Sequence, residues 1–272
     1  MDYRKLLEHA IRIFNERTDA DFSGERILLE YLTADDAIPV FEKFCSEHFP
    51  HRLSDRYMED GYFDFRASTF VSKEPDGIDG ILLRTDIPCH PDELIHVFLH
   101  ELAHIYHTRN ELDGKNFYDL YCDGQAESTY EDGAINAGYA VWRECIAEIV
   151  AFELDDDWIV EPLKRKKRLL TQLRRDIDPM NGKLAVSQIL VAVMTSKEVE
   201  MADSWDIAKE AIDSLSLFEH PQEIALMALV YKQLRERFVE IDIEFISALG
   251  TLYLSVLSAI MIETFSNRLK EE

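Results

Sequence analysis

The most constraining feature of the sequence is a pair of histidines four residues apart in an apolar segment, VFLHELAHIY (97–106). The apolar residues around them predict a helix from about residue 91 to about residue 110. Residues four apart on a helix are offset by about 40° and rise about 6 Å, so His100 and His104 leave the same face. A solvated face does not suit such apolar surroundings, and the HExxH pattern therefore predicts a metal site.

The chemistry of this pattern points to zinc. Two imidazoles so placed can bind one Zn²⁺ at about 2.0–2.1 Å, and a catalytic zinc site usually has three protein ligands and one open position. Glu101 follows the first histidine, so its carboxylate can reach a water on the metal. Zinc lowers the pKa of such a water toward about 7, and a carboxylate base can take its proton during attack on a carbonyl.

A third ligand has to come from another segment, and the next strongly helical stretch (137–154) offers two candidates. Glu144 and Glu148 lie one turn apart on this otherwise apolar helix. Burying a carboxylate there costs several kcal/mol unless something compensates it, and a metal would do so. One glutamate can bind the metal while the other accepts the remaining N–H of a ligand histidine. The spacing alone leaves open which glutamate does which.

Together, His100-Glu101-Leu102-Ala103-His104 and the later Glu144-x-x-Ala147-Glu148-x-x-Ala151 resemble the zincin metallopeptidases, in particular the gluzincin branch. The resemblance covers about residues 60–155. It implies that Glu144 is the third ligand and Glu148 orients a ligand histidine; the reverse order stays open because Glu148 also begins an ExxA pattern. The metzincin branch does not fit, because His107 and Asn110 stand where it has glycine and histidine.

The same resemblance implies a peptide or protein substrate, held in extended form by an edge strand before the motif helix. The segment 80–87 (GILLRTDI) stands where that strand belongs. Gluzincins generally stabilise the oxyanion with a tyrosine or a histidine. The sequence leaves four candidates for this role: His107, Tyr130, Tyr139 and His220.

The rest of the chain predicts an α+β fold that is predominantly helical. Amphipathic or apolar patterns indicate helices at 3–17, 23–32 and 35–48, and aromatic and β-branched residues favour strands at 62–72 and 80–87. Everything after residue 158 has helical patterns. We expect a zincin-like core with N-terminal helices over 1–157 and a helical C-terminal half over 158–272.

The charge and the residue patterns of the chain limit which partners and which cellular location we expect. The net charge of −24 disfavours nucleic acid and anionic membranes. The basic run 164–168 is expected to be a solvated helix face, and the 18 uncharged residues 245–262 a buried core or subunit-interface helix rather than a membrane span. The N-terminus has no signal-peptide pattern, and the four cysteines form no disulfide framework, so the expected location is the cytoplasm.

Zinc-dependent peptide hydrolysis is the first hypothesis. A catalytically silent zincin-fold binding or regulatory module is the alternative, against which the intact Glu101 argues. A helical interaction protein with an accidental HExxH is a third possibility. His96 and His107 extend the histidine stripe as expected neighbours of the site, whereas His48 and His51 are expected at the surface.

Overall fold

The computed structural model describes residues 1–58, 62–74, 76–110, 129–155, 162–175, 182–236 and 242–271. These residues form many helices and one three-stranded sheet, which confirms the predicted α+β, predominantly helical fold. The chain divides into two compact units: Met1–Asn116 with Ala147–Trp158, and Phe117–Ile146 with Ile159–Glu272. The chain therefore passes between the units three times: after Asn116, after Ile146 inside the helix α5 (Thr129–Leu154), and after Trp158.

The first unit is built on a small mixed sheet. Its strands are β1 (Ile27–Leu32), β2 (Ala67–Phe70) and β3 (Asp79–Arg84), in the order β1-β3-β2. β1 pairs with β3 in parallel and β2 pairs with β3 in antiparallel, with Thr69 opposite Ile81. β3 is thus the central strand, and β2 is an edge of this sheet.

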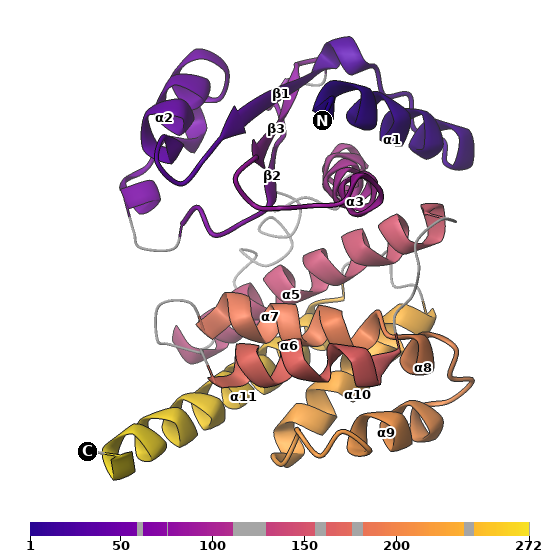
Figure 1. Ribbon diagram of the computed structural model, residues 1–272, viewed down its shortest axis with the longest axis vertical. Helices are drawn as coiled ribbons and strands as arrows, with labels where there is room; N and C mark the ends of the chain where they lie inside the picture. Colours follow the sequence, from indigo (N-terminus) through magenta and orange to yellow (C-terminus); the bar gives the residue numbers. More distant parts are fainter. Residues whose placement is uncertain are drawn as a thin grey trace. The chain divides into compact units, whose positions relative to one another are not determined.

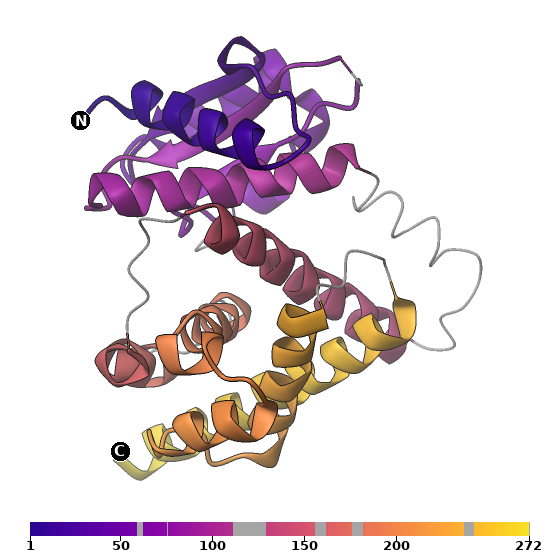
Figure 2. The same ribbon diagram turned by 90° about the vertical axis from the view of Figure 1, so that its right-hand side faces the viewer.

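Helices cover both faces of the sheet (Figures 1 and 2). The helices α1 (Tyr3–Arg17) and α3 (Pro91–Arg109) pack side by side on the face that carries Ile81 and Leu83, together with Ala147, Ala151 and Leu154 of α5. The helix α2 (Ala37–His48) packs on the opposite face around Leu82. Alternate residues of β3 therefore enter two different cores, as the two-residue period of a strand requires. Short 3-10 turns at Gly24–Arg26, Pro50–Arg52 and Asp55–Met58 complete the unit.

Two predictions for this unit were wrong. Residues 23–32 are not a helix, because only Gly24–Arg26 form a helical turn and Ile27–Leu32 form β1. Segment 80–87 does not supply an edge strand, because β3 has a strand hydrogen-bonded on each side. Both errors concern pairing between segments far apart in sequence, since Ile27 lies opposite Asp79. Such partners outweigh local propensity.

The second unit is helical throughout the residues that the structure describes. It contains the first part of α5 and six further helices: α6 (Leu163–Arg175), α7 (Gly182–Met194), α8 (Lys197–Glu200), α9 (Trp205–Asp213), α10 (Pro221–Glu236) and α11 (Ile243–Glu271). The helices α5 and α11 meet at two glycines. A Cβ on Gly138 would lie 1.9 Å from the carbonyl oxygen of Ile246, and one on Gly250 would lie 1.6 Å from that of Ala134. Only glycine allows this close approach of the two backbones.

The helix α11 has an unusual distribution of apolar residues. By length and composition its segment Ile243–Glu263 could cross a membrane, with mean hydropathy 2.0 and 33% of the most apolar window buried. Ile246, Leu249 and Tyr253 recur at helical spacing and are buried, whereas Ile262 and Phe265 are exposed. The helix therefore combines a stripe in the core of the second unit with an apolar outer surface.

Candidate metal centre

The N-terminus of the helix α3 is well defined because two side chains accept backbone N–H groups around its first turn. The ring of His90 accepts the N–H of Asp92, the Glu93 carboxylate accepts the N–H of His90, and Pro91 occupies the first helical position. This reciprocal arrangement is a capping box. Apolar residues of α3 then pack against the sheet and α1, which fixes the rotation of the helix about its axis.

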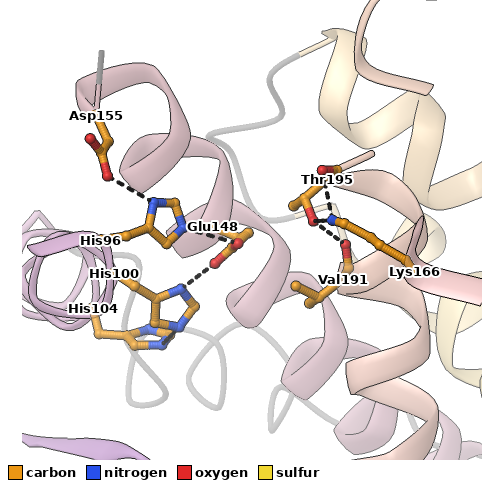
Figure 3. Close-up of polar contacts among 8 residues, drawn as sticks. All are labelled: His96, His100, His104, Glu148, Asp155, Lys166, Val191 and Thr195. Carbon is orange, nitrogen blue, oxygen red and sulfur yellow. Dashed lines mark hydrogen bonds and ion pairs between the residues drawn. The ribbon is translucent and has the colours of Figure 1, made fainter. Parts of the chain in front are cut away.

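A stripe of histidines runs along one side of α3. His96, His100 and His104 follow one another at four-residue intervals, and their rings lie on the side of α3 that meets the end of α5 (Figure 3). His96 and His104 are buried, and the side chain of His100 is 17% exposed. Buried imidazoles need polar partners or a metal, because desolvation of an uncompensated polar group is costly.

The Nε2 atoms of the two motif histidines face each other. Nε2 of His100 lies 3.1 Å from Nε2 of His104. Two nitrogen ligands about 2.0–2.1 Å from one tetrahedral Zn²⁺ would be separated by roughly 3.3 Å. The observed 3.1 Å is the length of a hydrogen bond between the two rings, and it is also close to the separation of two nitrogens that share one metal ion.

Glu148 determines which nitrogen of His100 can bind a metal. Its Oε2 lies 2.9 Å from Nδ1 of His100. An ionised carboxylate only accepts hydrogen bonds, so Nδ1 carries the proton and donates it to Glu148. In the neutral ring Nε2 then has a lone pair, and that lone pair faces His104. This is the tautomer that a metal-binding histidine needs.

The same carboxylate also contacts a second histidine. Oε1 of Glu148 lies 3.2 Å from Nε2 of His96, and Nδ1 of His96 lies 3.4 Å from Oδ2 of Asp155 (Figure 3). Burial opposes ionisation of Glu148, but hydrogen bonds from His100 and His96 and their charges hold its pKa below the ordinary value. Burial likewise lowers the pKa of His96, but the neighbouring carboxylates of Asp155 and Glu148 outweigh it and raise that pKa above its ordinary value.

The other helical glutamate lies near the two motif histidines. One donor atom each from His100, His104 and Glu144 lie within 4.8 Å of one another. This proximity follows from α5 itself, because Glu144 lies one turn before Glu148 on the same unbroken helix. Among the residues that the structure describes, these three form the only such group of donors. Two imidazoles and one carboxylate are a donor set that suits Zn²⁺.

Glu101 lies on a different side of α3 from the histidine stripe and is held by the sheet. The residue is 7% exposed, and the hydroxyl of Thr69 on β2 contacts its carboxylate Oε2 at 2.5 Å. The same hydroxyl is 3.1 Å from the carbonyl oxygen of Glu101. Among the described residues, no hydrogen bond reaches the other carboxylate oxygen, Oε1.

The candidates for oxyanion stabilisation lie in different places. His107 is buried on α3, three residues beyond His104, and Tyr139 stacks on Trp142 with ring centroids 6.0 Å apart. His220 lies in the second unit, with Nε2 3.2 Å from the carboxylate of Glu263. The side chain of Tyr130 lies outside the described residues. Of the described candidates, only His107 extends the stripe formed by the motif histidines.

The remaining sequence candidates lie apart from this stripe. His48 ends α2 and His51 lies in the following turn, and both rings pack beside Phe49. Cys45, Cys89 and Cys145 form no disulfide bond, and Cys122 lies outside the described residues. In the basic run of α6 only Lys166 turns inward, donating to the carbonyl and hydroxyl oxygens of Thr195 at 2.9 Å each (Figure 3). Lys164, Arg165, Lys167 and Arg168 are exposed, as expected for a solvated face.

Sequence reasoning missed two residues of this centre, Thr69 and Asp155. Thr69 precedes Glu101 by 32 residues, and Asp155 follows His96 by 59. Neither has a local pattern that sets it apart, because each acquires its partner only when the sheet and α5 pack against α3.

Comparisons with models of known families, with curated proteins and with solved structures found no match.

Proposed function

We propose that the protein is a zinc-dependent peptidase in which His100, His104 and Glu144 hold the metal and Glu101 is the general base. The observation that carries this proposal is the pair of Nε2 atoms 3.1 Å apart, with a carboxylate of α5 beside them. If the HExxH pattern on this core helix were accidental, nothing would require a glutamate from another helix to lie beside its two histidines.

The residues around this group favour a catalytic site over a closed structural one. Structural zinc sites are usually filled by four protein ligands and are rich in cysteine, whereas catalytic sites have three and leave a position open. The described donor group has three members and no cysteine. A silent zincin-fold module has no use for a base beside the metal, and Glu101 is present.

The chain's own residues have distinct roles in the proposed reaction. A bound Zn²⁺ would supply a Lewis acid and lower the pKa of a water toward about 7. Glu148 keeps His100 in the binding tautomer, as its 2.9 Å contact indicates. Glu101 takes a proton from the attacking water at Oε1 and returns it to the leaving amine. Thr69 holds the other oxygen of Glu101 and thereby orients it.

The strand β2 is the proposed binding edge for the substrate. It is an edge of the sheet and carries Thr69, which contacts the base. A peptide in extended form could add to such an edge through backbone hydrogen bonds. β2 thus replaces the segment 80–87 in the role that the family resemblance implies.

The test combines zinc content with peptide cleavage. Protein purified without an affinity tag is analysed for metals by mass spectrometry and incubated with a peptide library. We expect about one zinc per chain and cleavage that a chelator abolishes. Glu101→Gln should keep its zinc and lose cleavage, while Glu153→Gln, an exposed position on α5, should keep both. Absence of zinc binding, or full turnover by Glu101→Gln, would overturn the proposal.

A further inference from the structure

We infer that the second unit carries a docking surface for a second copy of this chain, in which α6 of one copy packs against α9 of the other. Both helices belong to the second unit. The inference goes beyond the proposed function and depends neither on zinc nor on peptide cleavage. It rests on two exposed faces, one basic and one acidic, that match each other in charge and in apolar content.

The basic face of α6 consists of Arg165, Arg168 and Leu169. It is a local exception in an acidic chain, because the 13 residues of α6 hold seven of the 29 Lys and Arg residues and no Asp or Glu. Leu163 and Leu170 are buried and join the helix to the core, whereas Leu169 is 50% exposed. Both arginines are exposed, and neither forms an ion pair with the residues that the structure describes.

The acidic face of α9 consists of Asp206, Ile207 and Glu210, and it has the same arrangement with the opposite charge. Ala208 and Ile212 are buried and join α9 to the core, whereas Ile207 is 52% exposed. The two carboxylates flank Ile207 on one side of the helix, because residues three or four apart are neighbours there. Both are exposed, and within the described part of the chain neither has an ion-pair partner.

The two faces complement each other. Each has one half-exposed aliphatic side chain beside charges of a single sign, and the signs are opposite. If the faces meet, Leu169 can pack against Ile207 while the arginines lie opposite the carboxylates. An apolar centre with a charged rim is the usual anatomy of a protein interface. The aliphatic side chains then contribute affinity, and the rim charges determine which partner fits.

Charge favours a second copy over other partners of α6. A long polyanion such as nucleic acid would meet the cations of α6, but the rest of a chain with net charge −24 would repel it. A second copy carries both faces, so a two-fold axis places α6 of each copy on α9 of the other and makes the same contact twice. Two acidic copies also repel each other at long range. At about 0.15 M salt that repulsion is largely screened beyond about 8 Å.

Charge reversal on each face tests the inference. A first variant combines Arg165→Glu with Arg168→Glu, so that both faces are acidic, and a second combines Asp206→Lys with Glu210→Lys, so that both are basic. Size-exclusion chromatography with light scattering gives the mass at about 0.15 M salt over a range of protein concentrations. We expect the mass of two chains for the parent and half that mass for each variant, because like charges would then face each other.

A matched control separates the two faces from net charge. Arg12→Glu combined with Lys43→Glu changes the net charge by the same amount as the first variant. Both residues are exposed, on α1 and α2 of the first unit. We expect this control to keep the mass of two chains. A control that fell to the mass of one chain would show an effect of net charge alone and would overturn the inference.

An equimolar mixture of the two reversed variants gives the sharpest readout. In the mixture, the acidic α6 of the first variant meets the basic α9 of the second, and the unchanged α9 of the first meets the unchanged α6 of the second. We expect the mass of two chains to return. A variant that had lost association by unfolding would not regain it, so this readout separates loss of the contact from loss of the fold. A mixture that stays monomeric, or reversed variants that stay dimeric, would overturn the inference. A parent that is monomeric at every concentration would assign the two faces to other partners and would overturn it as well.

Discussion

Glu148 accepts a hydrogen bond from Nδ1 of His100 at 2.9 Å, and this contact links the two helices that supply the candidate metal ligands. It directs the other nitrogen of His100 toward His104. The two glutamates of α5 therefore differ in their surroundings, although the sequence makes them nearly equivalent. Glu148 contacts the back of a ligand ring, and Glu144 lies among the donor atoms.

The first prediction concerns Glu148. We expect Glu148→Ala to weaken zinc binding about 10–100-fold, because His100 loses the acceptor that fixes its tautomer. Glu153→Ala, on the same helix but exposed, should bind zinc like the parent. Competition titration with a zinc chelator measures both affinities. Equal affinity of Glu148→Ala and the parent would remove Glu148 from this role.

The second prediction separates the two glutamates by magnitude. If Glu144 is the third ligand, Glu144→Gln should weaken zinc binding by more than about 100-fold, beyond the effect of an outer partner. The amide keeps the size of the side chain and removes its charge. Zinc content after dialysis against a weak chelator measures the difference. A smaller loss for Glu144→Gln than for Glu148→Ala would reverse the two assignments.

The third prediction tests how Thr69 positions the base. We expect Thr69→Val to lower peptide turnover. The loss should correspond to about 1.5–3 kcal/mol of transition-state stabilisation, since hydrogen bonds to charged groups have this strength. Zinc content should not change, because Thr69 contacts Glu101 rather than the metal donors. Thr69→Ser retains the hydroxyl and should restore most of the turnover. Parental kcat in Thr69→Val would show that this hydroxyl does not position Glu101.

Much of the fold could be predicted because periodicity is a local signal. The helices α1, α2 and α3 begin and end within a few residues of the expected positions. The helix expected at 23–32 failed because Leu28, Leu29 and Glu30 also suit helices, and their parallel partners lie some 50 residues later. A parallel pairing leaves no hairpin signal in the sequence.

The same difference between local patterns and long-range contacts decides which residues of the candidate site could be predicted. HExxH and the two glutamates of α5 are patterns within single helices, so sequence reasoning could find His100, His104, Glu144 and Glu148. The contacts of Thr69 and Asp155 join different elements, so no pattern in the neighbouring residues predicts them. Which strand forms the sheet edge depends likewise on three segments at once.

The fourth prediction concerns the crossing of α5 and α11. Gly138→Ala should destabilise the second unit by about 1–3 kcal/mol or more, because its Cβ would meet the backbone of Ile246. Gly133→Ala lies on the same helix with nothing within 4 Å of its Cβ, and should stabilise by about 0.5–1 kcal/mol. Urea denaturation followed by circular dichroism measures both. Equal midpoints for the two variants would contradict this close crossing.

The central claim is that one metal ion is shared by His100, His104 and Glu144. The most direct test is a crystal structure of the zinc-loaded protein with anomalous diffraction data collected at the zinc edge. We expect one strong anomalous peak about 2.0–2.2 Å from Nε2 of His100, Nε2 of His104 and a carboxylate oxygen of Glu144. A zinc-loaded crystal with no peak there, or with its zinc on other residues, would contradict the account.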